Sequence, residues 1–240
     1  MNMDIKEYLK DIVKNLIERY EPVSVFVYGS FATNEQVDEI SDIEIGIIKG
    51  EKKINFNEIK DLEKKFNKRN KIKIRIYYFD PNNFKTPFTE SLFILKILKN
   101  NILLYGKPLF EIFEEPKISI IDIEREVGFN RGGILELYKR FRNNEFNLEN
   151  KNDLCKYILY LAACLEMIHG IFVYSYKEIV EKYQWEFSDF VKQIYEIRSK
   201  NELITEELFY KCLQFSDYIE KEIKTYINEK LKDKKELIVL

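Results

Sequence analysis

The sequence predicts an α+β fold in which a small mixed sheet flanked by helices, residues 1–116, is followed by a helical bundle, residues 117–240. Two observations support this prediction. In the first half, short stretches rich in β-branched and aromatic residues alternate with helical patterns. In the second half, apolar residues recur every three or four positions over long stretches, which is typical of packed amphipathic helices. With 240 residues, each part is long enough to bury its own core.

The first half begins with a helical pattern between Ile5 and Tyr20 that ends before Pro22. Three later stretches predict strands because they are short, β-branched and bounded by turn residues. They are "VSVFVY" (23–28), "SDIEIGII" (41–48) and "KIKIRIYYF" (71–79). Two further helices are expected, one marked by Phe56, Ile59, Leu62 and Phe66, and one over Leu92–Leu98 that runs into "NILLYGKPLF". The domain is expected to close near Glu115 and Pro116.

The second half lacks strand-like alternation and contains three long apolar stripes at helical spacing. The stripes are Ile134, Leu137, Tyr138 and Phe141; Leu154, Ile158, Leu161, Leu165, Ile168 and Phe172; and Leu208, Cys212, Phe215, Ile219, Ile223 and Tyr226. The stretch "RNNEFNLENKND" is rich in Asn and Glu and is expected to form the loop between the first two helices of the bundle.

The composition is that of a folded globular protein, with 45% hydrophobic and 33% charged residues. The three cysteines fall at apolar helical positions, so neither a disulfide framework nor a zinc site is expected. No apolar run approaches the roughly 18 residues needed to span a bilayer, and the start lacks the features of a leader. These features predict a cytoplasmic protein without a membrane partner.

A basic segment from Lys52 to Arg75 contains ten Lys or Arg and three Asp or Glu. Such a segment can mark a polyanion partner such as a nucleotide triphosphate or nucleic acid, but most charge runs are the solvated face of a helix. The formal net charge of −2 argues against long nucleic acid as the main partner, because that binding needs many contacts to phosphates.

The candidate site centres on Asp42 and Glu44, two carboxylates within a strand otherwise made of isoleucine. Residues two apart in a strand point to the same side, so the two carboxylates form one cluster. Like charges this close require a cation between them, either a hard metal such as Mg²⁺ or Lys and Arg partners. Gly29 and Ser30 follow the first strand, where a glycine turn that opens a helix would offer backbone amides and a hydroxyl to phosphate.

The stretch "YGSFATNEQVDEISDIEIGII" resembles the signature of the DNA polymerase β-like nucleotidyltransferase superfamily, a Gly-Ser turn followed by Ser-Asp-x-(Asp or Glu) in a strand. It is most similar to the kanamycin nucleotidyltransferase type, which also has Ser-Asp-Ile-Glu and a helical C-terminal domain. The resemblance implies that Asp42 and Glu44 hold Mg²⁺ and that Gly29 and Ser30 bind the triphosphate. A nucleoside monophosphate would then pass to a hydroxyl of a small molecule or a protein.

The third strand departs from the family pattern, which places a third carboxylate there. In "KIKIRIYYF" the matching face carries Lys73 and Arg75. Cations at these positions would either bind the triphosphate or neutralise Asp42 and Glu44 without metal. The second option defines the alternative hypothesis, a catalytically inactive domain that binds a nucleotide or a protein partner in a regulatory or antitoxin-like role.

Further candidates lie in the helical half. The resemblance implies a general base there, and Glu136 is expected in this role, with Glu126 as the alternative. His169, the only histidine, is expected at the edge of the core rather than in catalysis, and Trp185 is expected to be a packing residue. Asn34 replaces a glycine common in the family, a small change because Asn tolerates unusual backbone angles.

Overall fold

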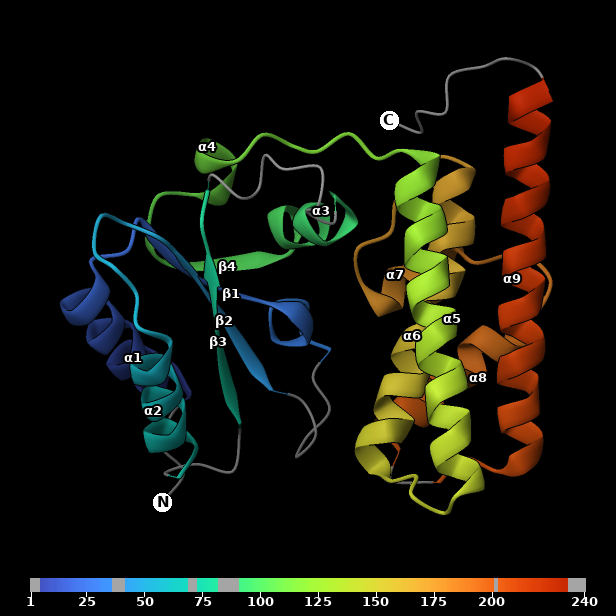
Figure 1. The fold of residues 1–240 in the computed structure, drawn as a ribbon, viewed down its shortest axis with the longest axis horizontal. Helices are drawn as coiled ribbons and strands as arrows, with labels where there is room; N and C mark the ends of the chain where they lie inside the picture. Colours follow the sequence, from blue (N-terminus) through green and yellow to red (C-terminus); the bar gives the residue numbers. More distant parts are fainter. Residues whose placement is uncertain (1–4, 36–41, 69–72, 82–90, 201–202, 233–240) are drawn as a thin grey trace. The chain divides into compact units, whose positions relative to one another are not determined.

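The computed structural model describes residues 5–35, 42–68, 73–81, 91–200 and 203–232. The chain forms two compact units, Met1–Pro116 and Lys117–Leu240. The first unit contains a sheet flanked by helices and the second is helical, which confirms the predicted α+β fold (Figure 1). The elements of the first unit are α1 (Ile5–Tyr20), β1 (Ser24–Tyr28), η1 (Gly29–Phe31), β2 (Ile43–Ile48), α2 (Phe56–Asn67), β3 (Ile74–Phe79), α3 (Ser91–Lys99), β4 (Asn101–Gly106) and α4 (Leu109–Ile112).

The sheet has four strands in the order β3-β2-β1-β4. β1 pairs antiparallel with β2 and β4, while β2 and β3 are parallel. The three strands predicted from sequence are confirmed, but they begin at Ser24, Ile43 and Ile74, so that Val23, Asp42 and Lys73 precede them; positions 41, 71 and 72 lie outside the described residues. β4 was not predicted, because it begins two residues after α3 and its apolar run continues that of the helix.

The two faces of the sheet bury different cores. Ile43, Ile45 and Ile47 of β2 pack with α1 and α2, and each of these isoleucines is at most 1% exposed. Burial of such a side chain stabilises the fold by about 2 kcal/mol. Phe26, Tyr28 and Ile48 belong to a second core on the opposite face, with residues of α3 and α4 (Figure 1). Strand alternation therefore places Glu44 on the face of α3 and α4.

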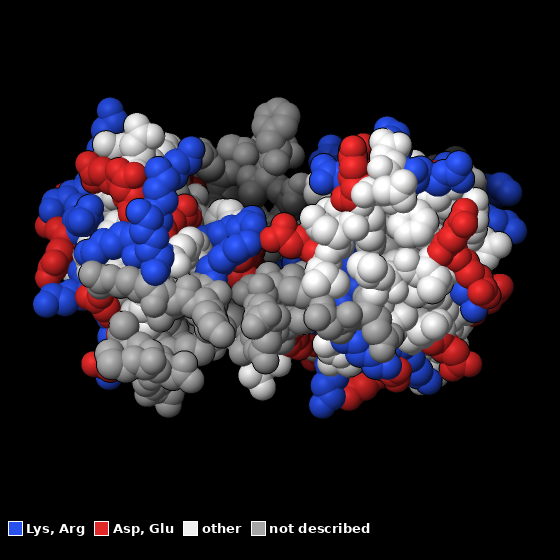
Figure 2. All heavy atoms as spheres, turned by 90° about the horizontal axis from the view of Figure 1, so that it is seen from below, with Lys and Arg blue, Asp and Glu red and all other residues white. Residues whose placement is uncertain are grey.

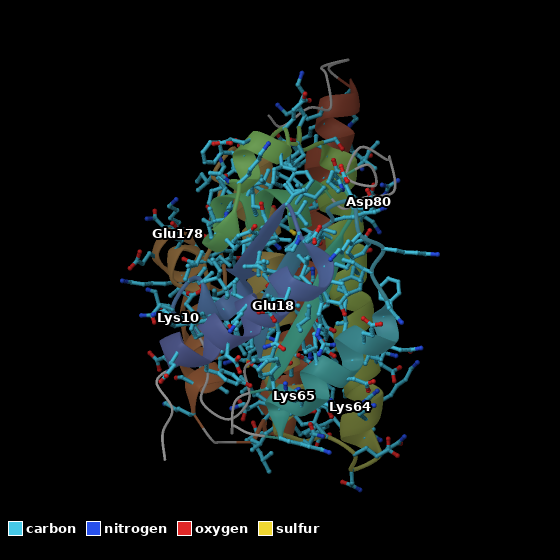
Figure 3. The ribbon with its side chains drawn as sticks, turned by 90° about the vertical axis from the view of Figure 1, so that its left-hand side faces the viewer. Lys10, Glu18, Lys64, Lys65, Asp80 and Glu178 are labelled. Atoms are coloured by element: carbon cyan, nitrogen blue, oxygen red, sulfur yellow. The ribbon has the colours of Figure 1, made fainter. Side chains whose placement is uncertain are left out.

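Side chains of α2 fix the register of β3. Asn67 accepts from the Ile74 N–H at 2.6 Å and donates to the Ile74 carbonyl at 3.1 Å, and Glu63 accepts from the Ile76 N–H at 2.6 Å. β3 is an edge strand, and these bonds satisfy main-chain groups of β3 that are not paired with β2. The opposite surface of α2 carries Lys64 and Lys65, which are labelled in Figure 3.

The basic segment is interrupted by acidic partners. Lys64 pairs with Asp61 at 3.6 Å and Lys52 with Glu21 at 2.7 Å, all with well-exposed side chains. Figure 2 shows Lys and Arg side chains gathered over the first unit, with acidic side chains between them. This surface has the mixed charge of a solvated helix face.

The second unit consists of α5 (Ile120–Arg142), α6 (Leu148–Ile168), α7 (Tyr176–Lys182), α8 (Ser188–Ser199) and α9 (Glu206–Lys232). Ser119, Asn147 and Ser175 form capping boxes that begin α5, α6 and α7. The predicted loop "RNNEFNLENKND" is therefore too long. Asn147 ends it, because its side chain caps the helix that begins at Leu148.

Among the helices of the described residues, none is long and apolar enough to cross a membrane. The three cysteines are buried, as their apolar positions predicted, and the structure shows no disulfide among them. Burial raises the pKa of the Cys155 thiol to about 12, so this thiol stays protonated at neutral pH.

Candidate functional site

The turn after β1 differs from the predicted start of a helix. Gly29–Phe31 form one 3₁₀ turn, in which the Gly29 carbonyl accepts from the N–H groups of Ala32 and Thr33 at 3.1 and 3.3 Å. A single turn has no helix macrodipole of consequence, so phosphate binding here would depend on local amides and the Ser30 hydroxyl. Asn34 has a φ of 59°, a left-handed conformation that fits the expected tolerance of asparagine.

Gly29 makes room for the Glu44 carboxylate. Tyr28 pairs with Glu44 across β1 and β2, which places the following residue beside the Glu44 side chain. Gly29 has a φ of 72°, and a Cβ at this position would collide with Oε2 of Glu44. The Gly-Ser turn and the carboxylates Asp42 and Glu44, at least 12 positions apart in sequence, are thus parts of one site.

Arg75 is a cation that faces the carboxylates. Its Nε lies 2.5 Å from Oδ2 of Asp42, and it pairs with Glu44 in the register of β2 and β3. The Asp42 side chain is 15% exposed and the Arg75 side chain is 59% exposed. A hydrogen bond to Tyr77 raises the pKa of Arg75, and the charges of Asp42 and Glu44 act in the same direction.

Lys73 directly precedes β3, and its carbonyl accepts from the Ile43 N–H at 2.8 Å. Its side chain is exposed. The sequence predicted Lys73 and Arg75 on the face of Asp42 and Glu44. In the structure, Arg75 forms an ion pair with Asp42.

Aromatic side chains continue the face that carries Glu44. The Tyr28 ring lies 5.9 Å from Tyr77 and 6.1 Å from Phe93 between centroids. Burial raises the pKa of Tyr28, and the charge of Glu44 raises it further, so Tyr28 remains a neutral phenol. Tyr77 lies two residues after Arg75 and so shares its side of β3, whereas Phe93 belongs to α3 and reaches this face through tertiary packing.

The candidates of the helical half belong to the second unit. Glu136 lies on α5 and is 56% exposed, with Lys139 and Arg140 at 3.6 and 3.7 Å. Glu126 lies on the same helix, where its side chain accepts from Asn130 at 3.2 Å. The assignment of Glu136 or Glu126 as general base stays a prediction.

His169 ends α6 and stacks on Trp185 with ring centroids 4.3 Å apart. Burial lowers the pKa of His169, which keeps its ring neutral. Trp185 donates to Oε1 of the buried Glu166 at 2.9 Å. These contacts are those of packing residues.

The chemistry of Asp42 and Glu44 fits one hard divalent cation. Mg²⁺ in proteins takes one or two carboxylates and completes its shell with water and substrate phosphates. Within the part of the chain that the structure describes, no group of three or more His, Cys, Asp or Glu side chains is placed to hold a metal. Asp42 and Glu44 could supply two carboxylates to a magnesium ion, whose other ligands would be water and phosphate oxygens.

Comparisons with known proteins bear on the family and the fold. Residues 10–108 match the family described as Polymerase beta, Nucleotidyltransferase. This match covers most of the first unit and confirms the resemblance seen in the sequence.

The fold is similar to a crystal structure of spectinomycin adenyltransferase AAD(9) from Enterococcus faecialis with ATP and spectinomycin. The TM-score is 0.61, and the match covers 91% of this chain and 97% of that chain. The sequences are 13% identical, so this likeness establishes the fold alone. No curated protein matches the sequence.

Proposed function

We propose that the protein is a Mg²⁺-dependent nucleotidyltransferase that moves a nucleoside monophosphate from a nucleotide triphosphate to a hydroxyl group. The observation that carries this proposal is the Glu44 carboxylate seated against Gly29, with Asp42 two residues earlier. A glycine that leaves space for a carboxylate at the end of a strand joins the two halves of the family signature in one site. The match of residues 10–108 to a nucleotidyltransferase family supports the same reaction class.

Each candidate site residue of the first unit has a specific role in this proposal. Asp42 and Glu44 hold the cation, and Gly29 and Ser30 bind phosphate oxygens through amides and the hydroxyl. Bound there, Mg²⁺ would supply charge neutralisation for phosphoryl transfer. Arg75 exchanges Asp42 for a phosphate oxygen of the triphosphate, for which a guanidinium is well suited. Lys73 is assigned to the outer part of the same triphosphate.

The acceptor provides a hydroxyl that attacks the α-phosphate, and pyrophosphate leaves. Glu136 is assigned as the base that removes the proton of this hydroxyl, with Glu126 as the alternative. Spectinomycin is the first acceptor to test, because the similar structure contains it with ATP. Aminoglycosides and protein tyrosines complete the panel.

The experiment measures pyrophosphate release from ATP or GTP with Mg²⁺ and this panel. Asp42→Asn is expected to abolish release. Asp80→Asn is the matched control, because Asp80 is 17% exposed and pairs with Lys49 at 3.3 Å in the same unit (Figure 3). Release that persists in Asp42→Asn at the level of Asp80→Asn would refute the assignment.

The Asp42–Arg75 ion pair favours one second candidate, a binding module without catalysis. Calorimetry together with the pyrophosphate assay separates the two functions. A binding module would bind the triphosphate but release no pyrophosphate with any acceptor. Replacement of Arg75 or Lys73 by aspartate supplies the acid that the family places on this strand. Turnover gained by either replacement would identify the natural chain as the module.

A further inference from the structure

The site borders an exposed aromatic surface that the proposed phosphate chemistry does not use. Tyr77 of β3 is 37% exposed and Phe93 of α3 is 38% exposed. Two buried rings support them from below, Tyr28 at 4% and Phe79 at 9% exposure. The Phe79 centroid lies 6.4 Å from Phe93, and the Tyr28 centroid lies 5.9 Å from Tyr77. The exposed rings are therefore held by packing, with part of each left open to solvent.

This surface lies next to the cation and phosphate groups. Tyr77 follows Arg75 by two residues in β3 and lies on the same side of the sheet. At a rise of about 3.3 Å per residue, their Cα atoms are about 7 Å apart. Tyr77 also hydrogen-bonds to Arg75, the residue that pairs with Asp42. A ligand with phosphates at Asp42 and a ring one ribose away would place that ring near Tyr77.

We propose that Tyr77 and Phe93 form the binding surface for the nucleobase of the triphosphate. This inference rests on the proposed function, because it takes the phosphates to lie at Asp42, Glu44 and Ser30. Aromatic side chains bind bases by stacking on their π faces, which requires no particular pattern of donors and acceptors. The protein should accordingly accept both ATP and GTP and bind them more tightly than the smaller pyrimidine nucleotides.

The test compares two probes by calorimetry on the full chain in the presence of Mg²⁺. ATP carries phosphates and a base, whereas inorganic tripolyphosphate carries phosphates alone. Tyr77→Leu and Phe93→Leu keep apolar contact with the buried rings and remove the aromatic face. Each is expected to weaken ATP binding about tenfold and to leave tripolyphosphate binding within about twofold of the unchanged chain.

Two further variants separate the causes. Tyr77→Phe keeps the ring and loses the hydrogen bond to Arg75, so it should bind ATP like the unchanged chain. Phe110→Leu is the matched control, because Phe110 is 76% exposed on α4 of the same unit. It should leave both probes unaffected.

The inference is overturned if ATP binding survives both leucine variants, or if tripolyphosphate binding falls as much as ATP binding. The second result would mean that the substitutions weaken phosphate binding at Arg75 and not binding of the nucleobase. Loss of acceptor turnover in the leucine variants with unchanged ATP binding would assign the rings to the acceptor and also overturn it. If neither probe binds the unchanged chain and no pyrophosphate is released, the proposed function fails together with this inference.

Discussion

Replacing Gly29 with alanine tests whether this glycine serves to place the Glu44 carboxylate. The change has two effects, a backbone strain at a φ of 72° and a collision between the new Cβ and Oε2 of Glu44. Gly170 provides the matched control. It has a φ of 78°, and a Cβ there would meet nothing within 4 Å. Gly170→Ala therefore carries the strain without the collision.

The two effects have different consequences. A left-handed conformation costs an alanine about 1–2 kcal/mol of folding free energy in either variant. The collision involves the end of a flexible side chain, so Glu44 rotates away at little cost and the two variants should be destabilised within about 0.5 kcal/mol of each other. A carboxylate moved by about 1 Å, however, costs about a hundredfold in catalysis. Function should fall only in Gly29→Ala.

Stability is measured by chemical denaturation, and function by pyrophosphate release together with Mg²⁺-dependent ATP binding. The expected result is an equal loss of stability in both variants and a selective loss of function in Gly29→Ala. The reasoning is refuted if Gly29→Ala retains the activity and ATP affinity of Gly170→Ala. It is also refuted if Gly29→Ala is several kcal/mol less stable than the control, since Glu44 would then be held rigidly.

Three other predictions concern the fold and its response to pH. Lys151 is fully buried and donates to two main-chain carbonyls at the end of α8, so Lys151→Met should lower the unfolding free energy by about 1–3 kcal/mol in urea titrations. Asn67→Ala removes both side-chain bonds to Ile74 and should increase hydrogen exchange at the Ile74 amide; unchanged exchange contradicts the proposed register clamp. Burial raises the pKa of Glu166, so the folded state holds its proton more tightly and stability falls as pH rises from the ordinary glutamate value through the raised one. Glu166→Gln should weaken this pH dependence of stability, which can be measured from unfolding curves followed by the fluorescence of Trp185, the only tryptophan. A pH profile identical to that of the unchanged chain would contradict this role of Glu166.

The first three strands were predictable because they are short, rich in β-branched and aromatic residues, and bounded by turn residues. In β2, Ile43, Ile45 and Ile47 face α1 and α2 while Glu44 and Gly46 face the other side, and the sequence shows this difference as alternation. The long stripes of α5, α6 and α9 follow from the same principle at helical period. The fourth strand has no such signal. Ile102, Leu103 and Tyr105 of β4 are all 38–43% exposed, and the strand is defined by pairing with β1.

The sequence predicted which residues form the site, but it did not predict which of them contact one another. The sequence grouped Asp42 with Glu44 and placed Lys73 and Arg75 nearby, but the identity of the cation that reaches Asp42 depends on the register of β3. That register is fixed by Asn67 of α2, a helix-to-strand contact that no local pattern encodes. The space that Gly29 leaves for Glu44 likewise depends on pairing between β1 and β2.

The ion pair between Asp42 and Arg75 is too weak to exclude catalysis. Because the Arg75 side chain is 59% exposed, water screens the pair, and its contribution to stability is no more than about 1 kcal/mol. A triphosphate complex of micromolar affinity is worth about 8 kcal/mol, so its binding readily offsets the loss of this pair. The released guanidinium lies beside the position of the phosphates and regains a charge-assisted hydrogen bond there. A cation in place of the third acid thus removes one metal ligand while it supplies one phosphate ligand, which is why we place catalysis ahead of the inactive module.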